Sequence, residues 1–240
     1  MQKSTLLRIL FYVTGLLCLA LGIILNTKSG LGVSPIISVS YSIATILKVN
    51  FGNMTFILYA IFVLIEIVLH SIRYLRTEKE VKKQEYKVLQ PTVHKSFSLI
   101  LLSDLLQLPL SLVFTRFMNL FSDWIPAPGK NFGIRFVVLL AGILLTGIGA
   151  AMSLNMRIIP NPGDGIVQAI ADFIHKPVGF TKNCFDLVNI CITISVGMIF
   201  AHRLIGVGIG TVVSVLGVGR VIAAFNHFFM ERMVATAGVE

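Results

Sequence analysis

Charged residues are scarce in this chain. They make up 13% of its 240 residues, about half the share of a typical soluble domain, whereas hydrophobic residues make up 55%. Several apolar runs approach the roughly 20 residues that a helix needs to cross about 30 Å of hydrocarbon. This composition excludes an ordinary soluble domain and predicts an integral membrane protein whose first partner is the lipid bilayer.

Cysteines are also few, and the common catalytic motifs are missing. Cys18, Cys184 and Cys191 lie singly inside apolar runs, which is typical of small hydrophobic residues and leaves no paired ligands for a metal. No His-Glu-x-x-His, Gly-x-Ser-x-Gly, Walker or dinucleotide-binding sequence occurs. The segment 161–164 (NPGD) resembles the Gly-x-Gly-Asp of intramembrane aspartyl proteases, but Asn161 replaces the first glycine. We predict no enzymatic activity, catalytic residue, cofactor or metal.

The net charge of +9 comes from basic residues that lie between the apolar runs. This placement favours control of topology and attraction to anionic lipid over binding of nucleic acid. The segment 71–95 is the most basic and is predicted to be a solvated, helical cytoplasmic loop. With both termini inside, the cytoplasmic face gains that loop and Lys3, Arg8, Arg157, Lys176, Lys182 and Arg232. The outer face holds Lys28, Lys48, Arg116, Lys130, Arg135 and Arg203. The excess inside predicts a multi-pass protein of the plasma (inner) membrane with both termini cytoplasmic.

Six transmembrane helices are predicted, at about 6–25, 54–70, 97–120, 135–152, 181–200 and 204–225. The first is predicted to stay uncleaved, because no small-residue cleavage site ends its apolar run. Two more apolar segments, 35–47 and 163–174, are too short to span the membrane as helices. Each follows a break that contains proline and glycine.

The two halves of the chain are similar at one fixed offset, without a gap. The matching positions are Gly15 with Gly142, Gly22 with Gly149, Pro35 with Pro162, and Gly52 with Gly179, and their common spacing is the repeat offset. Each half holds three crossings, an odd number, so the halves are predicted to lie in opposite orientations. The predicted fold is an all-α integral membrane protein with six transmembrane helices in two inverted three-span repeats, 1–121 and 122–240. Each repeat contains one short broken, re-entrant helix.

The two short helices are the predicted site. Irregular backbone survives in the bilayer core only where it is packed in protein or lines a wet cavity, and inverted repeats with interrupted helices are typical of transporters. The helix N-termini would then meet near the middle and present free N–H groups. The alternative is a pair of amphipathic connectors lying flat at the interface. The predicted substrate-binding residues are Ser34, Pro35, Ser38, Tyr41, Asn161, Pro162, Gly163, Asp164 and Gln168.

Three ionisable residues are candidates for coupling, each with a structural alternative. Asp164 either caps the second short helix or takes part in function. Asp186, about one and a half turns into the fifth span, either faces the bundle or snorkels to the headgroups. Arg220 either pairs with one of these acids or snorkels toward phosphates. Glu66 and Asp104 are weaker candidates, and Asp172 is predicted to be a solvated helix end. Gly206, Gly210 and Gly217 are predicted to form a close-packing stripe on the sixth span.

Three segments, 30–35 (GLGVSP), 161–165 (NPGDG) and 206–211 (GVGIGT), resemble the YczE/YyaS/YitT-type family of bacterial multi-pass membrane proteins. The resemblance covers most of the chain, from the first span to the sixth. It implies a plasma-membrane protein of transporter-like build and no particular substrate. The chain departs where such proteins often carry Pro-Trp-Asp, because Ile36 and Ile37 follow Pro35 and leave no acid in the first short helix.

These features predict a transporter-like protein. The leading hypothesis is a secondary permease for a small polar or anionic solute bound between the Pro35 and Pro162 hairpins. The alternative is a non-transporting membrane subunit, either the substrate-binding component of an energy-coupled importer or a membrane scaffold. A homo-oligomer or a partner membrane protein is compatible with each of them.

Overall fold

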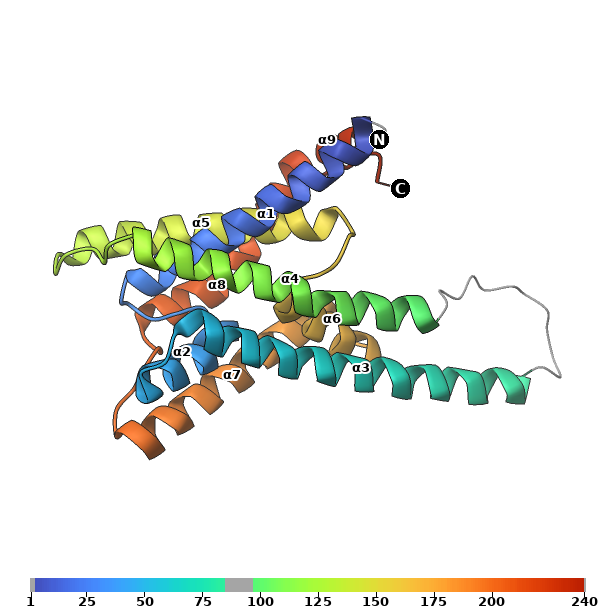
Figure 1. Ribbon diagram of the computed structural model, residues 1–240, viewed down its shortest axis with the longest axis horizontal. Helices are drawn as coiled ribbons and strands as arrows, with labels where there is room; N and C mark the ends of the chain where they lie inside the picture. The colour runs from blue at the N-terminus through green and yellow to red at the C-terminus, as the bar shows by residue number, and fades with distance from the viewer. Residues whose placement is uncertain (1–2, 85–96, 240) are drawn as a thin grey trace.

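A computed structural model of the chain describes residues 3–84 and 97–239 (Figure 1). The described residues are helical and contain no strand. The helices are α1 (Lys3–Lys28), α2 (Pro35–Leu47), α3 (Phe51–Gln84), α4 (Phe97–Trp124), α5 (Phe132–Asn155), α6 (Pro162–Ile174), α7 (Val178–Ala201), α8 (Ile209–Phe225) and α9 (Glu231–Ala237). A π-helical turn, Asn226–Met230, joins α8 to α9.

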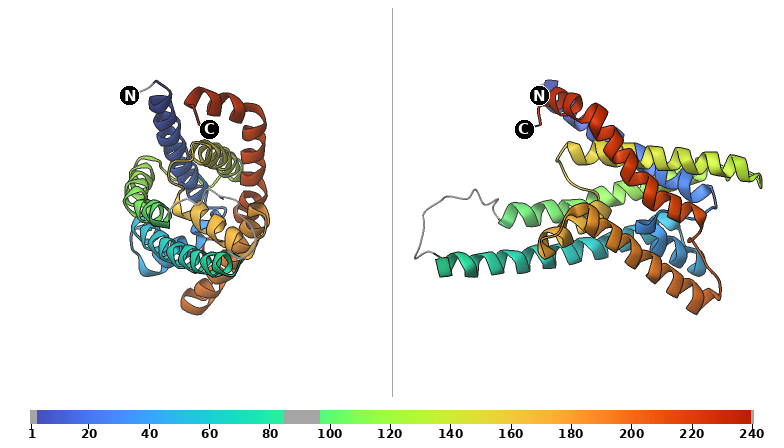
Figure 2. Two further views of the ribbon diagram at one scale, coloured as in Figure 1. Left: turned by 90° about the vertical axis from the view of Figure 1, so that its right-hand side faces the viewer. Right: turned by 180° about the vertical axis from the view of Figure 1, so that it is seen from behind.

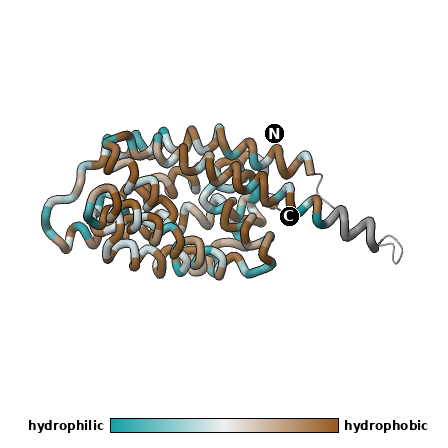
Figure 3. Tube along the Cα trace, turned by 90° about the horizontal axis from the view of Figure 1, so that it is seen from below, coloured by the Kyte–Doolittle hydropathy of each residue, from teal (hydrophilic) through white to brown (hydrophobic). Residues whose placement is uncertain are grey.

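Six helices are long and apolar enough to cross a membrane: α1, α3, α4, α5, α7, and α8 with its continuation to Ala237. In Figure 3 hydrophobic residues dominate the helical trace, and hydrophilic residues gather at loops and helix ends. Many large apolar side chains are exposed along these helices, as expected of surfaces that face lipid rather than water. The chain is therefore an integral membrane protein, as its composition predicts.

Most predicted spans are confirmed, with ends a few residues longer than predicted, but the sixth is wrong at its start. The chain from Leu204 to Gly208 is not helical, and α8 begins at Ile209. Gly206 has a φ of 80°, which suits glycine and interrupts any helix. Close packing is confirmed for Gly210, against Leu31, and for Gly217, against Ile143. Gly206 does not belong to that helical stripe.

The predicted loop 71–95 is helical as far as Gln84, because α3 continues into it, and residues 85–96 lie outside the described part. The C-terminal tail is also helical and returns to the start of the chain, where Gly238 lies beside Ser4. Figure 2 shows the two termini next to each other at one corner of the molecule.

Helices α1 and α5 form the tightest pair in the fold, lying along each other in Figure 1. Their glycines meet in antiparallel order, Gly15 against Gly149 and Gly22 against Gly142. At each glycine an added Cβ would press against the backbone of the facing helix, at 2.8 Å from the Ser153 nitrogen in the case of Gly15. Small residues at such crossings let two backbones approach closely, which drives helix association in lipid.

Arg8 fastens the start of α1 to the end of α5. Its Nε donates to the Met156 carbonyl at 2.8 Å, and its guanidinium also donates to the Arg157 carbonyl at 3.1 Å. These carbonyls lie just past the end of α5, where a helix leaves its last C=O groups without helical partners. A cation there also interacts favourably with the helix dipole.

Arg135 does the same at the other end of the pair. Its Nε donates to the Ser29 carbonyl at 2.7 Å and its second nitrogen to the Gly30 carbonyl, just past the end of α1. Arg135 follows Arg8 by the repeat offset, and Ser29 and Gly30 precede the two residues that Arg8 contacts by the same offset. The two contacts therefore exchange when the halves of the chain are exchanged.

The helix ends follow the same spacing. Shifted by the repeat offset, both ends of α2 fall on the ends of α6, the end of α1 falls on the end of α5, and the start of α3 falls on the start of α7. Between the elements, α2 packs on α7 and α6 packs on α3. The α6–α3 contact is therefore the counterpart of the α2–α7 contact when the two halves of the chain are exchanged.

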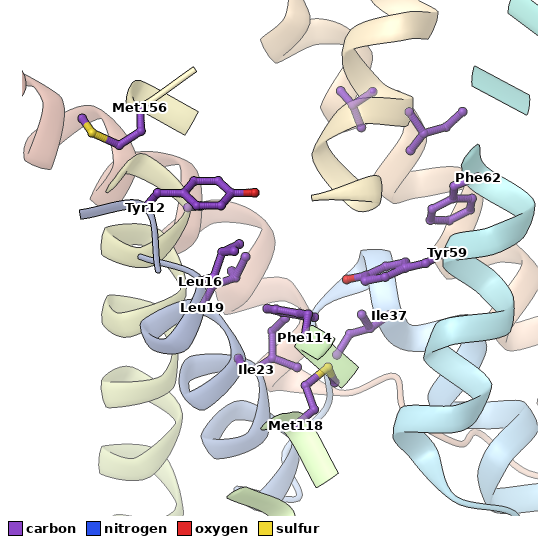
Figure 4. Close-up of a cluster of buried hydrophobic side chains, with 14 of the residues drawn as sticks. Tyr12, Leu16, Leu19, Ile23, Ile37, Tyr59, Phe62, Phe114, Met118 and Met156 are labelled. Carbon is purple, nitrogen blue, oxygen red and sulfur yellow. The ribbon is translucent and has the colours of Figure 1, made fainter. Parts of the chain in front are cut away.

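A hydrophobic core fills the space between α1 and its neighbours α2, α3 and α4 (Figure 4). Leu16, Leu19 and Ile23 of α1 face Ile37, Tyr59, Phe114 and Met118 across it. The Tyr59 hydroxyl points into the middle of this cluster. Tyr12 donates its hydroxyl hydrogen to the Ile159 carbonyl at 2.7 Å, which holds the segment leading into α6.

Candidate functional site

The two short helices are built alike. Each starts with proline at its first position, where the missing N–H costs no hydrogen bond. The residues before them, Ser34 and Asn161, have nearly the same backbone conformation, with ψ of 137° and 138°. Each helix ends at a left-handed residue, Lys48 or His175. Neither Ser34 nor Asn161 caps its helix with its side chain, so both side chains are available to another partner.

Both N-termini line one small cavity of about 40 Å³. Ser34 and Ile36 reach it from α2, and Asn161, Gly163 and Asp164 reach it from α6. The Ile36 side chain covers Gly163, where an added Cβ would lie 3.0 Å from the Ile36 Cδ1 atom. A cavity of this size holds a few water molecules. The N-termini of the two short helices therefore lie at the same small cavity.

Tyr59, Thr146 and Lys182 complete the polar lining of this cavity. Asn161 is 5% exposed, and its Oδ1 atom has no hydrogen-bond partner among the described residues. The Tyr59 side chain interacts with the Asn161 side chain. An orphaned buried amide oxygen is uncommon in folded proteins and calls for a donor from water or a ligand.

Two charged side chains, Asp164 and Lys182, line the cavity, and a third, Asp186, lies near them. Asp164 lies close enough to Lys182 and Asp186 for their charges to act on one another. Asp186 is 5% exposed and faces the bundle, and its Oδ1 is also without a partner in the described chain. Lys182, half-buried on α7, makes no ion pair within 4.0 Å among the described residues. Two acidic side chains and one lysine therefore lie near one another at the cavity.

The structure brings together only part of the predicted binding set. Ser34, Asn161, Gly163 and Asp164 line the cavity, and the buried Pro35 and Pro162 start the helices beside it.

The other predicted residues lie elsewhere. Ser38 forms a hydrogen bond with Thr193 at 2.7 Å, and Tyr41 packs edge-on against Phe51. Gln168 is exposed and donates to Asp172 at 2.9 Å.

The ionisable candidates lie in different surroundings. Asp186 is buried and faces the bundle, so the snorkelling alternative does not apply to it. Arg220 is exposed and forms no ion pair within the described chain, so of its two alternatives the pairing with an acid is not seen there. It points away from the bundle because its position on α8 faces outward. Asp172 pairs with Arg73 at 2.9 Å and is partly exposed, as expected of a helix end.

A second and larger cavity of about 400 Å³ lies between α3, α4 and α6. Its polar lining residues are Glu66, His70, Ser103, Asp104, Gln107 and Gln168. His70 Nδ1 lies 2.8 Å from Asp104 Oδ2, and Gln107 Nε2 donates to Glu66 Oε2 at 2.7 Å. On α3, Glu66 lies about two helical turns, or roughly 10 Å, from Tyr59 at the central cavity.

Sequence reasoning ranked Glu66 and Asp104 low and missed His70 and Gln107 as site residues. The sequence does carry a signal. Glu66 and His70 lie at i and i+4 on α3, and Asp104 and Gln107 lie at i and i+3 on α4, so the two members of each pair are one helical turn apart. Four such residues within two apolar spans indicate a shared polar face.

A family model described as a family of unknown function, DUF6198, matches residues 6–81 and 86–227. The chain belongs to the DUF6198 family. No curated protein and no solved structure matches it. The likeness to YczE/YyaS/YitT-type proteins therefore stays a resemblance, whereas membership of a helical membrane family of unknown function is established.

Proposed function

We propose that this DUF6198 protein is a secondary permease for a small polar solute, bound between the N-termini of α2 and α6. One observation carries the proposal: two proline-started helices, related by the repeat offset, begin at the same small cavity, where Asn161 has a buried acceptor without a partner among the described residues. Two opposed helix N-termini offer N–H donors and positive dipole ends. The proposed role is binding and passage rather than catalysis.

The proposal includes two halves, 1–121 and 122–240, in opposite orientations. The exchange of the Arg8 and Arg135 contacts supports it, as does the exchange of α2 on α7 for α6 on α3. An antiparallel α1–α5 pair with glycines at matched positions fits an axis of pseudo-twofold symmetry. In this arrangement α2 and α6 are re-entrant from opposite faces, and both termini lie in the cytoplasm of a plasma-membrane protein.

The charges around the cavity narrow the solute class. Asp164 and Lys182 line the cavity and Asp186 lies near both, so acidic side chains outnumber basic ones around it. An anion would have to be desolvated beside two carboxylates, which costs free energy that the helix N-termini only partly offset. The proposal therefore favours a neutral polar or zwitterionic solute over the anionic one that the helix N-termini alone suggest.

Binding at the centre is tested on purified protein. Thermal unfolding is screened against a library of small polar metabolites, because a ligand of the folded state raises apparent stability. For a compound that stabilises, Asn161→Ala and Asp164→Asn are each expected to raise the dissociation constant about tenfold or more, the first by removing a hydrogen-bonding amide and the second by removing a charge. Arg220→Ala, which changes an exposed side chain, is the matched control and leaves the constant unchanged.

Transport is then measured in proteoliposomes with imposed proton and sodium gradients. Gradient-dependent uptake of the same compound supports the permease. Binding without movement, together with co-purification of an ATPase pair, supports the substrate-binding subunit of an energy-coupled importer instead. If no compound binds and alanine is tolerated at every buried acid, the permease is abandoned in favour of a scaffold.

Topology provides a separate prediction, from the two left-handed residues that end α2 and α6. Lys48 and His175 are exposed counterparts at the repeat offset, and inverted halves place them on opposite faces. In a background with all three cysteines replaced, Lys48→Cys is expected to react with a membrane-impermeant thiol reagent on intact cells. His175→Cys is expected to react only after the cells are opened. Reaction of both from the same side would contradict the inverted arrangement.

A further inference from the structure

We propose that the cavity between α3, α4 and α6 binds the ammonium group of a small organic cation, with Glu66 and Gln107 as its acceptors. This cavity is distinct from the central one. The inference concerns equilibrium binding and holds whether or not the protein transports anything.

The two acceptors are buried but incompletely satisfied. Glu66 and Gln107 are each 1% exposed and both line the cavity. One bond joins them, from Gln107 Nε2 to Glu66 Oε2 at 2.7 Å. The Oε1 atom of each side chain has no partner among the described residues. Two buried acceptors without donors in one cavity indicate a ligand that brings N–H groups.

Gly165 shows that the free oxygens lie close together. An added Cβ on Gly165 would lie 2.8 Å from Glu66 Oε1 and 3.0 Å from Gln107 Oε1. Both oxygens therefore lie close to the Gly165 Cα and near each other, on the side of the cavity that α6 forms. A single ammonium nitrogen, with hydrogen bonds of about 2.9 Å and three donors, can reach both.

The charges of the cavity favour a cation. Glu66 and Asp104 are carboxylates, and His70 is engaged by Asp104 at 2.8 Å. From α6 the cavity receives the neutral Gln168, and neither lysine nor arginine lines it. Nearby, Arg73 is paired with Asp172. A charge inside an apolar span is costly unless a cation or hydrogen bonds compensate it, and among the described residues Glu66 has one hydrogen bond, from Gln107, and no cation.

The size and walls of the cavity favour an organic cation over a metal ion. Its volume of about 400 Å³ falls in the range of small-molecule sites and far exceeds what Na⁺ needs. The remaining walls are apolar, from Leu99, Ile100, Pro160 and Ala169. A primary ammonium ion with a short alkyl chain fits both the acceptors and the walls. Its ammonium group would bind the acceptors, and its alkyl chain would pack against the apolar walls.

The test uses n-butylammonium chloride on the purified full-length protein, with thermal unfolding and isothermal titration as readouts. Butylammonium is expected to stabilise the protein, whereas n-butanol, n-butyrate and NaCl at equal concentration are not. Glu66→Gln keeps the shape and removes the charge, and is expected to weaken binding about 10- to 100-fold, the range for one charged hydrogen bond. Asp123→Asn, an exposed acid on α4, is the matched control and leaves binding unchanged.

Probes on the unaltered protein keep the test decisive even where Glu66→Gln fails to fold. Tetramethylammonium carries the charge without N–H donors and is expected to bind at least tenfold more weakly than butylammonium. Equal stabilisation by butanol overturns the proposal, as does equal stabilisation by Na⁺ or K⁺, which would indicate a metal-ion site. Unchanged butylammonium binding in a folded Glu66→Gln variant overturns it as well.

Discussion

Replacing Arg8 or Arg135 by alanine is expected to lower the free energy of unfolding by about 1–3 kcal/mol, and by similar amounts at the two positions. Each guanidinium donates two hydrogen bonds to carbonyls just past the end of the facing long helix. Alanine leaves these C=O groups without protein partners and removes a cation from the negative end of the helix dipole. Because each arginine is partly exposed, water compensates part of the loss. The measurement is unfolding of the purified protein by titration with a denaturing detergent.

Three further variants make this result specific. Lysine at position 8 or 135 keeps the charge but lacks the planar fork, so it is expected to restore only part of the lost stability. Arg220→Ala removes an exposed arginine that forms no ion pair within the described chain, and is expected to change little. A large loss at position 8 with none at position 135 would contradict the equivalence of the two contacts.

Hydropathy and turn residues were enough to predict most of the fold. A run of some 20 apolar residues has few structures open to it in a bilayer, so six spans follow from composition. Proline and glycine at Pro35 and Pro162 mark the broken helices because their backbone preferences are local. The start of α8 was misplaced because its position depends on contacts with residues far away in the chain. The segment 204–208 is apolar whether or not it is helical, and its non-helical form is held by the hydrogen bond from Val33 N to Gly206 O and by the contacts of Gly208 with Leu31 and Gly32.

Contacts across helices were beyond the sequence. Nothing near Arg8 in the chain indicates Met156, which lies 148 residues away. The charge count placed Arg8 and Arg135 on opposite sides of the membrane but assigned neither a partner. Only a folded antiparallel pair brings each arginine to the end of the other helix.

The candidate site was predictable in position but not in detail. Two proline-started helices indicated a common centre, and Ser34, Asn161 and Asp164 do meet there. Gln168, one turn after Asp164 on α6, does not reach that centre, because it lines the larger cavity and donates to Asp172. Gln107 drew no attention because an amide in an apolar span gains significance only from its partner, Glu66 of another helix.

In the proposed permease, the tightly packed α1–α5 pair has cavities with polar residues beside it. The α1–α5 pair is held by glycine contacts along its length and by an arginine at each end. Any alternation of access would then occur where α2 meets α7 and where α6 meets α3, while this pair stays fixed. Damage to the pair should therefore affect the amount of folded protein before it affects solute binding.

Gly22→Ala and Gly149→Ala test that division, with an expected loss of about 3 kcal/mol each, the upper end of the range for overpacking. A Cβ on Gly22 would collide with the backbone nitrogen of Thr146, and one on Gly149 with that of Leu19. Backbone cannot move aside as a flexible side chain can, so α1 and α5 must separate. Helix propensity alone would make alanine better than glycine by about 1 kcal/mol, so a loss isolates the clash.

Gly219→Ala on α8 is the matched control, because an added Cβ there meets nothing within 4 Å. It is expected to be neutral or to stabilise by up to about 1 kcal/mol. The two clashing positions are counterparts at the repeat offset, as are Thr146 and Leu19, so equal losses would support equivalent halves. If Gly22→Ala and Gly149→Ala behaved like Gly219→Ala in detergent titration, the close α1–α5 crossing would be wrong, and the axis proposed for the two halves would fail with it.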